Sequence, residues 1–305
     1  MPTWALYSVT VLVWGVSWHA LLYQVGVVAP ALSIAYRFLL AAAIMVAYCV
    51  ATRRRLRFGG RDLGLMAALG LSLFCINYIL FYYAATYLPT GLLSVVFSLI
   101  TVMNMINAAI MFRQRVELGV AIGALFGLGG LALTFWPDIA GHELNHRVAI
   151  GLALSLLGTL SASLGNMASV HLGQRGIGVI ESNTVGMCIG AAASFAFALV
   201  SGAELTYDPK PSYSISLLFL ALFATVIGFG CFLTLARRIG ASRAAYASVL
   251  FPILALALSA AFEDYRPPVE AILGVALVLV GNVFALWRRA PAIAGKAAAS
   301  QGAAK

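Results

Sequence analysis

The chain has 305 residues, of which 62% are apolar and only 10% are charged. Soluble domains are closer to half apolar and a quarter charged, so this composition excludes an ordinary soluble protein. The net charge of +9 does not indicate nucleic-acid binding, because the basic residues stand in short connections between apolar runs, where they set membrane topology.

The apolar residues form successive runs of about 20, the length that an α-helix needs to cross roughly 30 Å of hydrocarbon. The sequence therefore predicts an all-α membrane protein with ten transmembrane helices. In chain order, the predicted spans are 4–24, 31–51, 63–86, 91–112, 118–137, 148–168, 178–200, 214–236, 243–262 and 268–287. The first run has no basic segment before it and is too long for a signal peptide, so we expect it to remain as a helix.

Basic residues are divided unequally between the two sides of these spans. The 53–62 connection alone contains Arg53, Arg54, Arg55, Arg57 and Arg61, whereas the connections on the side opposite the N-terminus contain Arg147, Lys210 and Arg266. The positive-inside rule places both termini in the cytoplasm, which agrees with an even number of spans. We expect a multi-pass protein of the bacterial inner membrane, with a disordered cytoplasmic tail at 290–305.

The two halves of the chain align with each other at an offset of 151 residues. The matches are Leu71 with Leu222, Ala85 with Ala236, Leu99 with Leu250, Arg115 with Arg266, Gly123 with Gly274 and Gly130 with Gly281. Five spans per half is an odd number, so the halves enter the membrane from opposite sides. We predict two inverted five-helix repeats, over 1–145 and 146–289. Such repeats are typical of secondary transporters with a midplane substrate site; a duplicated bundle without a transport role is the alternative.

Short motifs in the chain resemble those of a known family. They are Trp14-Gly15-Val16-Ser17-Trp18, Pro30, Arg37-Phe38, the 84–93 turn and Phe251-Pro252-Ile253. In this order they resemble the ten-helix EamA-type branch of the drug/metabolite transporter superfamily, and in character its aromatic amino acid exporter subgroup. The chain departs from the family pattern at Thr101, where proline is frequent, and at Arg113-Gln114, where Gly-Glu is frequent. The resemblance implies export of amino acids or similar metabolites by alternating access, without a cofactor.

Very few ionisable residues lie within the spans. They are Arg37 in the second span, His19 in the outer half of the first and Glu270 at the outer start of the tenth. The absence of a midplane lysine or carboxylate disfavours phosphate-bearing substrates and proton-driven export of drug cations. It favours a neutral or zwitterionic solute, carried by a uniporter or with weak proton coupling through His19. Arg37 is a candidate for recognition of a substrate carboxylate or for an outer gate, with snorkelling to the interface as the alternative.

Aromatic residues at helical spacing are candidates for the wall of a substrate cavity. Phe74, Tyr78 and Tyr82 share one face of the third span, and Trp14 and Trp18 share one face of the first. They would stack on an aromatic or thioether side chain, although such a stripe also serves plain packing. Polar candidates for the ammonium and carboxylate are Ser94, Ser98, Thr101, Ser163, Asn166, Tyr246 and Ser248. Uncharged groups satisfy a zwitterion without the cost of a buried ion, unless they bond their own helix carbonyls.

Pro252 is the only proline well inside a span, where it removes a backbone donor and predicts a kink or hinge. The four cysteines have neither metal nor disulfide spacing, so we predict no metal site. We find no catalytic set and predict no enzyme; an intramembrane enzyme, a sensor and a proton-driven multidrug exporter are the alternatives. The expected partners are a small-molecule substrate and the lipid bilayer, without nucleic acid, for a monomeric protein.

Overall fold

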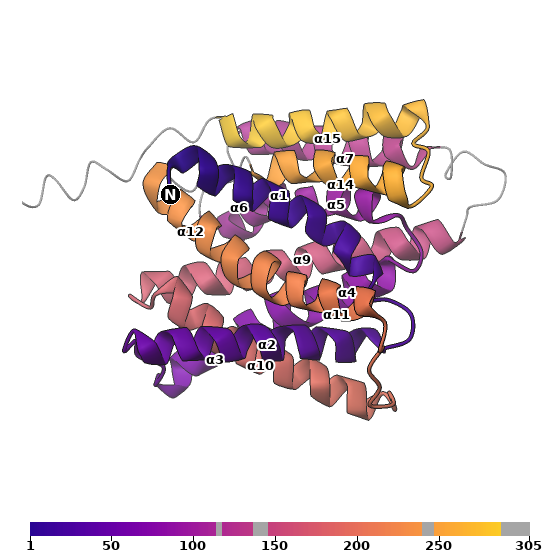
Figure 1. Cartoon of the computed structure of the whole chain (residues 1–305). Helices are drawn as coiled ribbons and strands as arrows, with labels where there is room; N and C mark the ends of the chain where they lie inside the picture. The colour runs from indigo at the N-terminus through magenta and orange to yellow at the C-terminus, as the bar shows by residue number, and fades with distance from the viewer. Residues whose placement is uncertain (114–117, 137–145, 240–246, 288–305) are drawn as a thin grey trace, which may run out of the picture.

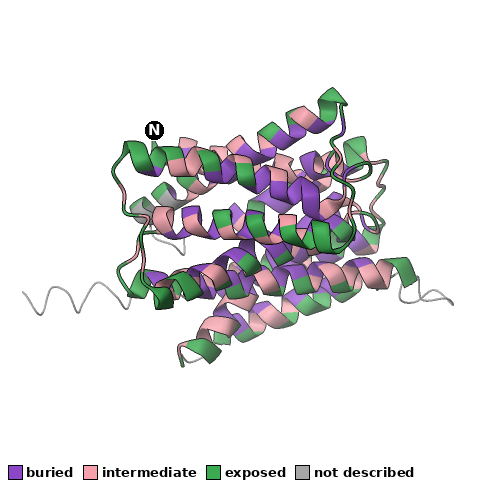
Figure 2. Cartoon of the chain, turned by 90° about the horizontal axis from the view of Figure 1, so that it is seen from below, coloured by how far each residue is buried: buried purple, intermediate pink, exposed green. Residues whose placement is uncertain are grey.

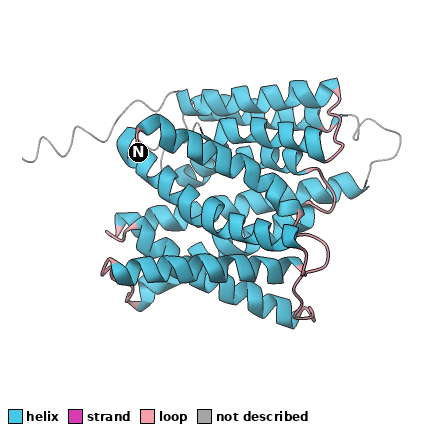
Figure 3. Ribbon diagram, viewed as in Figure 1, coloured by secondary structure: helices cyan, strands magenta, loops and turns pink. Residues whose placement is uncertain are grey.

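The structure, a computed structural model, describes residues 1–113, 118–136, 146–239 and 247–287. Every regular element within these residues is a helix, and none of them forms a strand (Figure 3). Eight helical segments are long and apolar enough to cross a membrane, and two further apolar helices are shorter. The described residues therefore have the fold of an all-helical, multi-pass membrane protein.

Three of the long segments are composite. The helices are α1 (Thr3–Leu22), α2 (Pro30–Ala51), α3 (Gly60–Leu71) continuing through the π-helix η1 (Ser72–Ile76) into α4 (Asn77–Ala84), α5 (Thr90–Ser98) continuing into α6 (Ile100–Met111), α7 (Leu118–Thr134), α9 (His146–Gln174), α10 (Val179–Val200), α11 (Pro211–Leu218) continuing through the π-helix η2 (Phe219–Ile227) into α12 (Gly228–Ile239), α14 (Ala247–Phe262) and α15 (Val269–Trp287).

The described helices coincide with the predicted spans to within a few residues, except at the end of the sixth. The apolar run predicts an end at 168, whereas α9 continues to Gln174. The helix ends there because Gly176 adopts a φ of +79°, and the N–H of Ile177 bonds back to the carbonyl of Leu172. The apolar run ends before the helix does, because the last turns of α9 contain polar residues. The start of the ninth predicted span, Tyr246, Arg115 and the 290–305 tail lie outside the described residues.

Successive segments run in opposite directions through the bundle (Figure 1). We call the end at which α1 begins the N-side; α15 finishes there, and the opposite end is the far side. α7 and α15 form one edge of the bundle, while α2, α3 and α10 form the other. Buried residues gather between the helices, and exposed residues lie on the outside of the bundle (Figure 2). The exposed residues include large apolar ones such as Leu125 and Ile110. Apolar side chains on the outer face are expected where the surrounding solvent is lipid.

α7 and α15 approach each other along a line of glycines. A Cβ atom on Gly123 would lie 2.7 Å from the carbonyl oxygen of Gly281, and one on Gly130 would lie 2.5 Å from that of Gly274. The earlier glycine of α7 faces the later glycine of α15, so the two helices are antiparallel. Glycine permits this approach where lipid supplies no hydrophobic force between helices. The line of glycines therefore sets both the distance and the direction of this pair.

A candidate substrate cavity in the middle of the bundle

A cavity of about 570 Å³ lies between the two edges of the bundle. Its wall is formed by residues of α1, α2, η1, α4, α5, α6, α9, α10, α12, α14 and α15. Small-ligand sites usually measure about 300–1,000 Å³. The cavity therefore has the size of a site for a small organic solute.

The cavity opens toward the N-side. Phe112 directly follows α6, Val179 is the first residue of α10 and Ser248 is the second of α14, and all three line the cavity while remaining partly exposed. By contrast, the lining residues Arg37 and Asn77 are buried. The site is thus reached from the N-side and closed at the far side.

Aromatic rings form much of the wall. The Trp18 ring lies 5.2 Å from the Phe81 ring and 5.5 Å from the Phe97 ring, between centroids. Trp14 lies 5.6 Å from Phe229 in an edge arrangement. Aromatic pairs prefer such edge and tilted contacts, which leave ring faces for a third partner. The aromatic residues that line the cavity are Trp14, Trp18, Tyr78, Phe81, Phe97, Phe112, Phe229, Phe232 and Phe251.

Arg37 brings a charge to this wall. Its side chain is 4% exposed, and its Nε and Nη2 atoms donate to the hydroxyl of Thr225 at 3.3 and 3.2 Å. Its Nη2 atom also lies 3.4 Å from the Tyr78 hydroxyl, and its Cζ atom lies 4.5 Å from the centroid of that ring. No carboxylate among the described residues forms an ion pair with it. A buried guanidinium held by neutral groups keeps donors available for an anionic ligand group.

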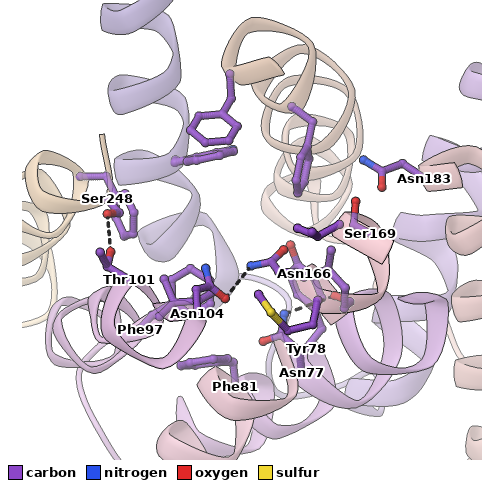
Figure 4. Close-up of a pocket in the computed structure, with 18 of the residues that line it drawn as sticks. Asn77, Tyr78, Phe81, Phe97, Thr101, Asn104, Asn166, Ser169, Asn183 and Ser248 are labelled. Atoms are coloured by element: carbon purple, nitrogen blue, oxygen red, sulfur yellow. Dashed lines mark hydrogen bonds between the residues drawn. The ribbon is translucent and has the colours of Figure 1, made fainter. Parts of the chain in front are cut away.

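Uncharged polar groups line the cavity nearer its opening. Figure 4 shows Asn166 directed toward Asn104, with Nδ2 and Oδ1 3.4 Å apart, and Thr101 facing Ser248 with 3.0 Å between the hydroxyls. Deeper in the cavity, Asn77 donates to the carbonyl of Leu73 at 3.3 Å, while its buried Oδ1 atom has no partner among the described residues. An acceptor of this kind is suited to an ammonium group.

Six predicted site residues, together with Arg37, contribute to the cavity wall: Trp14, Trp18, Tyr78, Thr101, Asn166 and Ser248. Sequence reasoning did not select Asn77, Asn104 and Asn183, which also line it. An amide within an apolar run carries a desolvation cost that a function or a partner must offset. Their position inside apolar runs was therefore the signal that could have identified all three as site residues.

The other predicted residues lie away from the wall. Phe74 and Tyr82 are fully buried in a packed cluster beside Phe38. Ser94 and Ser98 donate to the carbonyls of Gly91 and Val95 within their own helix, at 2.6 and 2.7 Å. Ser163 accepts a 2.8 Å hydrogen bond from Asn107, and Pro252 is buried in α14 beside the lining residue Phe251. His19 lies at the far side, near Glu263. Tyr246 lies outside the described residues.

A multi-pass helical bundle that encloses a solute-sized cavity with aromatic and polar walls has the architecture of a membrane transport protein. The sequence model of the EamA-like transporter family matches residues 3–136 and 149–287. The chain belongs to this family, which confirms the family resemblance of its motifs.

Similar proteins occur in archaea and bacteria. An "Uncharacterized transporter" of Archaeoglobus fulgidus is 24% identical over 289 residues, which are 95% of this chain and the whole of that protein. A "Probable amino-acid metabolite efflux pump" of Escherichia coli is 24% identical over 304 residues, covering 93% of this chain and 96% of the pump. A solved crystal structure with 18% identity superposes with a TM-score of 0.65 over 92% of this chain and 95% of the other. That structural likeness shows a shared fold.

Proposed function

We propose that the protein is a secondary transporter of the bacterial inner membrane. In this proposal it exports amino acids, aromatic and other neutral ones, or similar small metabolites, by alternating access as a uniporter or a weakly proton-coupled carrier. The observation that carries the proposal is the cavity, which combines aromatic walls with one buried guanidinium and several amides. The name of the Escherichia coli relative supports export of an amino-acid metabolite.

The cavity offers a separate partner for each part of a zwitterion. The carboxylate would accept from Arg37, and the ammonium would donate to acceptors such as Asn77 Oδ1. The substrate side chain would lie against Trp18 and its aromatic neighbours. Proton-driven export of drug cations has less support, because none of the described residues that line the cavity is acidic.

Alternating access is supported by contacts that recur between the two halves. The Nε2 atom of Gln24 donates to the Tyr213 carbonyl at 2.9 Å on the far side, and Arg175 pairs with Asp62 at 2.5 Å on the N-side. These contacts correspond at the 151-residue offset that matches Gly123 to Gly274, and residues 72–76 of η1 likewise correspond to 223–227 of η2. Equivalent contacts at opposite ends support two inverted repeats. The distribution of basic residues supports a cytoplasmic location for both termini.

The proposed function is tested by counterflow in proteoliposomes. Vesicles loaded with unlabelled phenylalanine should take up labelled phenylalanine in a saturable way, and glutamate or a sugar phosphate should compete poorly. The assay is run with and without a pH gradient to separate a uniporter from a proton-coupled carrier. If no amino acid drives exchange in protein that is folded, the proposed substrate class is wrong.

We expect Trp18→Ala to weaken transport of aromatic substrates selectively. The change removes a ring that contacts Phe81 and Phe97, so the KM for phenylalanine should rise by about tenfold, whereas that for alanine should change little. Competition assays in proteoliposomes measure both values. Trp4→Ala is the matched control, because Trp4 lies in the first turn of the same helix but is 73% exposed. Equal losses for both substrates would remove Trp18 from the side-chain pocket.

We expect Pro252→Ala to slow transport without preventing folding. Pro252 lies inside α14, where it interrupts backbone bonding beside the cavity residue Phe251, so it is a candidate hinge. The maximal counterflow rate should fall while the thermal unfolding midpoint in detergent is maintained. Pro211→Ala is the control, because a proline in the first turn of α11 interrupts no helical hydrogen bond. An unchanged rate for Pro252→Ala would indicate a static kink.

A further inference from the structure

Three helix ends meet around one carboxylate at the far side, where the cavity is closed. Glu263 directly follows α14, and its side chain is 8% exposed. It accepts from the backbone N–H of Thr90 at 2.9 Å and, through its other oxygen, from the Thr90 hydroxyl. Thr90 is the first residue of α5, so the carboxylate also lies at the positive end of that helix. The contact joins the start of α5 to the end of α14 at the far side.

His19 of α1 completes this cluster. Its Nδ1 atom lies 3.5 Å from Glu263 Oε1, is buried, and makes no hydrogen bond. Its Nε2 atom lies 3.4 Å from the Tyr23 hydroxyl, and its ring packs 5.2 Å from that of Phe262. At this distance a neutral imidazole contributes little electrostatic attraction to the carboxylate. A protonated one carries an N–H on both nitrogens and forms an ion pair across the closed end.

At the opposite end of the molecule, the two described positions equivalent to His19 and Glu263 hold no charge pair. At the 151-residue offset, Val170 corresponds to His19 and Phe112 corresponds to Glu263. Both are apolar, and both line the open mouth of the cavity at the N-side. The N-side has ion pairs elsewhere, Arg175 with Asp62 and Arg54 with Glu181, but closure at the two equivalent positions would join apolar groups, whereas closure of the far side joins titratable ones. The equivalent positions at the two ends therefore differ in whether they can bind a proton.

We propose that His19, Glu263 and Thr90 form a proton-binding gate, and that acid on the far side holds this gate closed and the cavity open toward the N-side. The inference rests on the alternating access of the proposed function. A proton shifts a conformational equilibrium only if it binds one state better. The closed state offers the imidazolium a carboxylate partner, so protons favour closure.

Other charged groups at this end are arranged differently. Arg147 at the start of α9 donates to the carbonyl of Thr86 and lies over the Tyr87 ring, and Glu270 lies in the first turn of α15. Asp264 and Arg266 are exposed in the connection that follows Glu263. Among the described residues, the Glu263 carboxylate contacts His19 and Thr90. The proton response should therefore depend on His19.

The gate is tested by labelling a cysteine in the cavity from the N-side. Ser169→Cys is a small change at a lining position. Membrane vesicles oriented with the N-side outward receive a membrane-impermeant maleimide in a bath kept at pH 7.5, while the lumen is set to pH 7.5 or 5.5. We expect the acidic lumen to accelerate labelling about two- to fivefold, the range for a partly exposed ion pair. The readout needs no substrate, so it remains valid if the proposed cargo is wrong.

Two variants of the Ser169→Cys protein should lose the response, His19→Gln and Glu263→Gln. His146→Gln should keep it, because His146 is an exposed histidine at the same end of the bundle. The parent protein without the introduced cysteine measures labelling of the native thiols. A response that survives in His19→Gln, or that is absent from the Ser169→Cys protein itself, overturns the proposal.

Discussion

Replacing Arg37 by glutamine should raise the KM for zwitterionic amino acids by about 10- to 100-fold, because a hydrogen bond to a charged group contributes about 1.5–3 kcal/mol. The guanidinium contacts the hydroxyls of Thr225 and Tyr78 and lies over the Phe38 ring, and it forms no ion pair among the described residues, so the substrate carboxylate would be its one charged partner. Counterflow at varied substrate concentration measures the change.

Two comparisons separate recognition from folding. Phenylalanine amide, which lacks the carboxylate, should compete equally well in the native protein and in Arg37→Gln. The thermal midpoint in detergent should not fall, because the variant removes a charge that is costly at membrane depth. Arg37→Lys keeps the charge but loses the forked donor geometry, so it should restore only part of the affinity. Equal losses for the acid and the amide would assign Arg37 a purely structural role.

Hydropathy alone predicted most of the helices, because a lipid environment forces each span to be long, apolar and internally hydrogen-bonded. It could not predict where spans change character within their length. The π-helical turns η1 and η2 and the break after Ser98 lie inside apolar runs that contain neither proline nor a charged residue at these points. These features depend on packing between neighbouring helices, which a single sequence does not report.

The candidate site was predictable at the level of residue type but not of helix face. Trp14, Trp18 and Tyr78 lie on the cavity wall, whereas Phe74 and Tyr82, from the same predicted stripe as Tyr78, pack against Phe38 or within the core. Helices inside a bundle are apolar on several sides, so periodicity does not identify the side that faces the cavity. The pairing of His19 with Glu263 was unpredictable for a different reason, since it joins residues that only the tertiary fold brings together.

The glycine line between α7 and α15 makes Gly274→Ala the variant with the largest expected effect on stability. A Cβ atom at this position would meet the backbone N of Thr134 at 2.5 Å and would also clash with the Gly130 carbonyl oxygen. Backbone cannot yield as a side chain does, so the two helices must separate. Overpacking of this kind costs about 1–3 kcal/mol, which should lower the thermal unfolding midpoint in detergent.

Gly129→Ala is the matched control on the same pair of helices. Its nearest contact would be the Leu277 side chain at 3.8 Å, which is an ordinary packing distance, and alanine favours the helix by about 1 kcal/mol over glycine. That variant should match or exceed the native midpoint. Because Gly123 faces Gly281 in the same way, Gly281→Ala should lower the midpoint as Gly274→Ala does. If Gly274→Ala and Gly129→Ala melt at the same temperature, close backbone contact does not hold this edge of the bundle together.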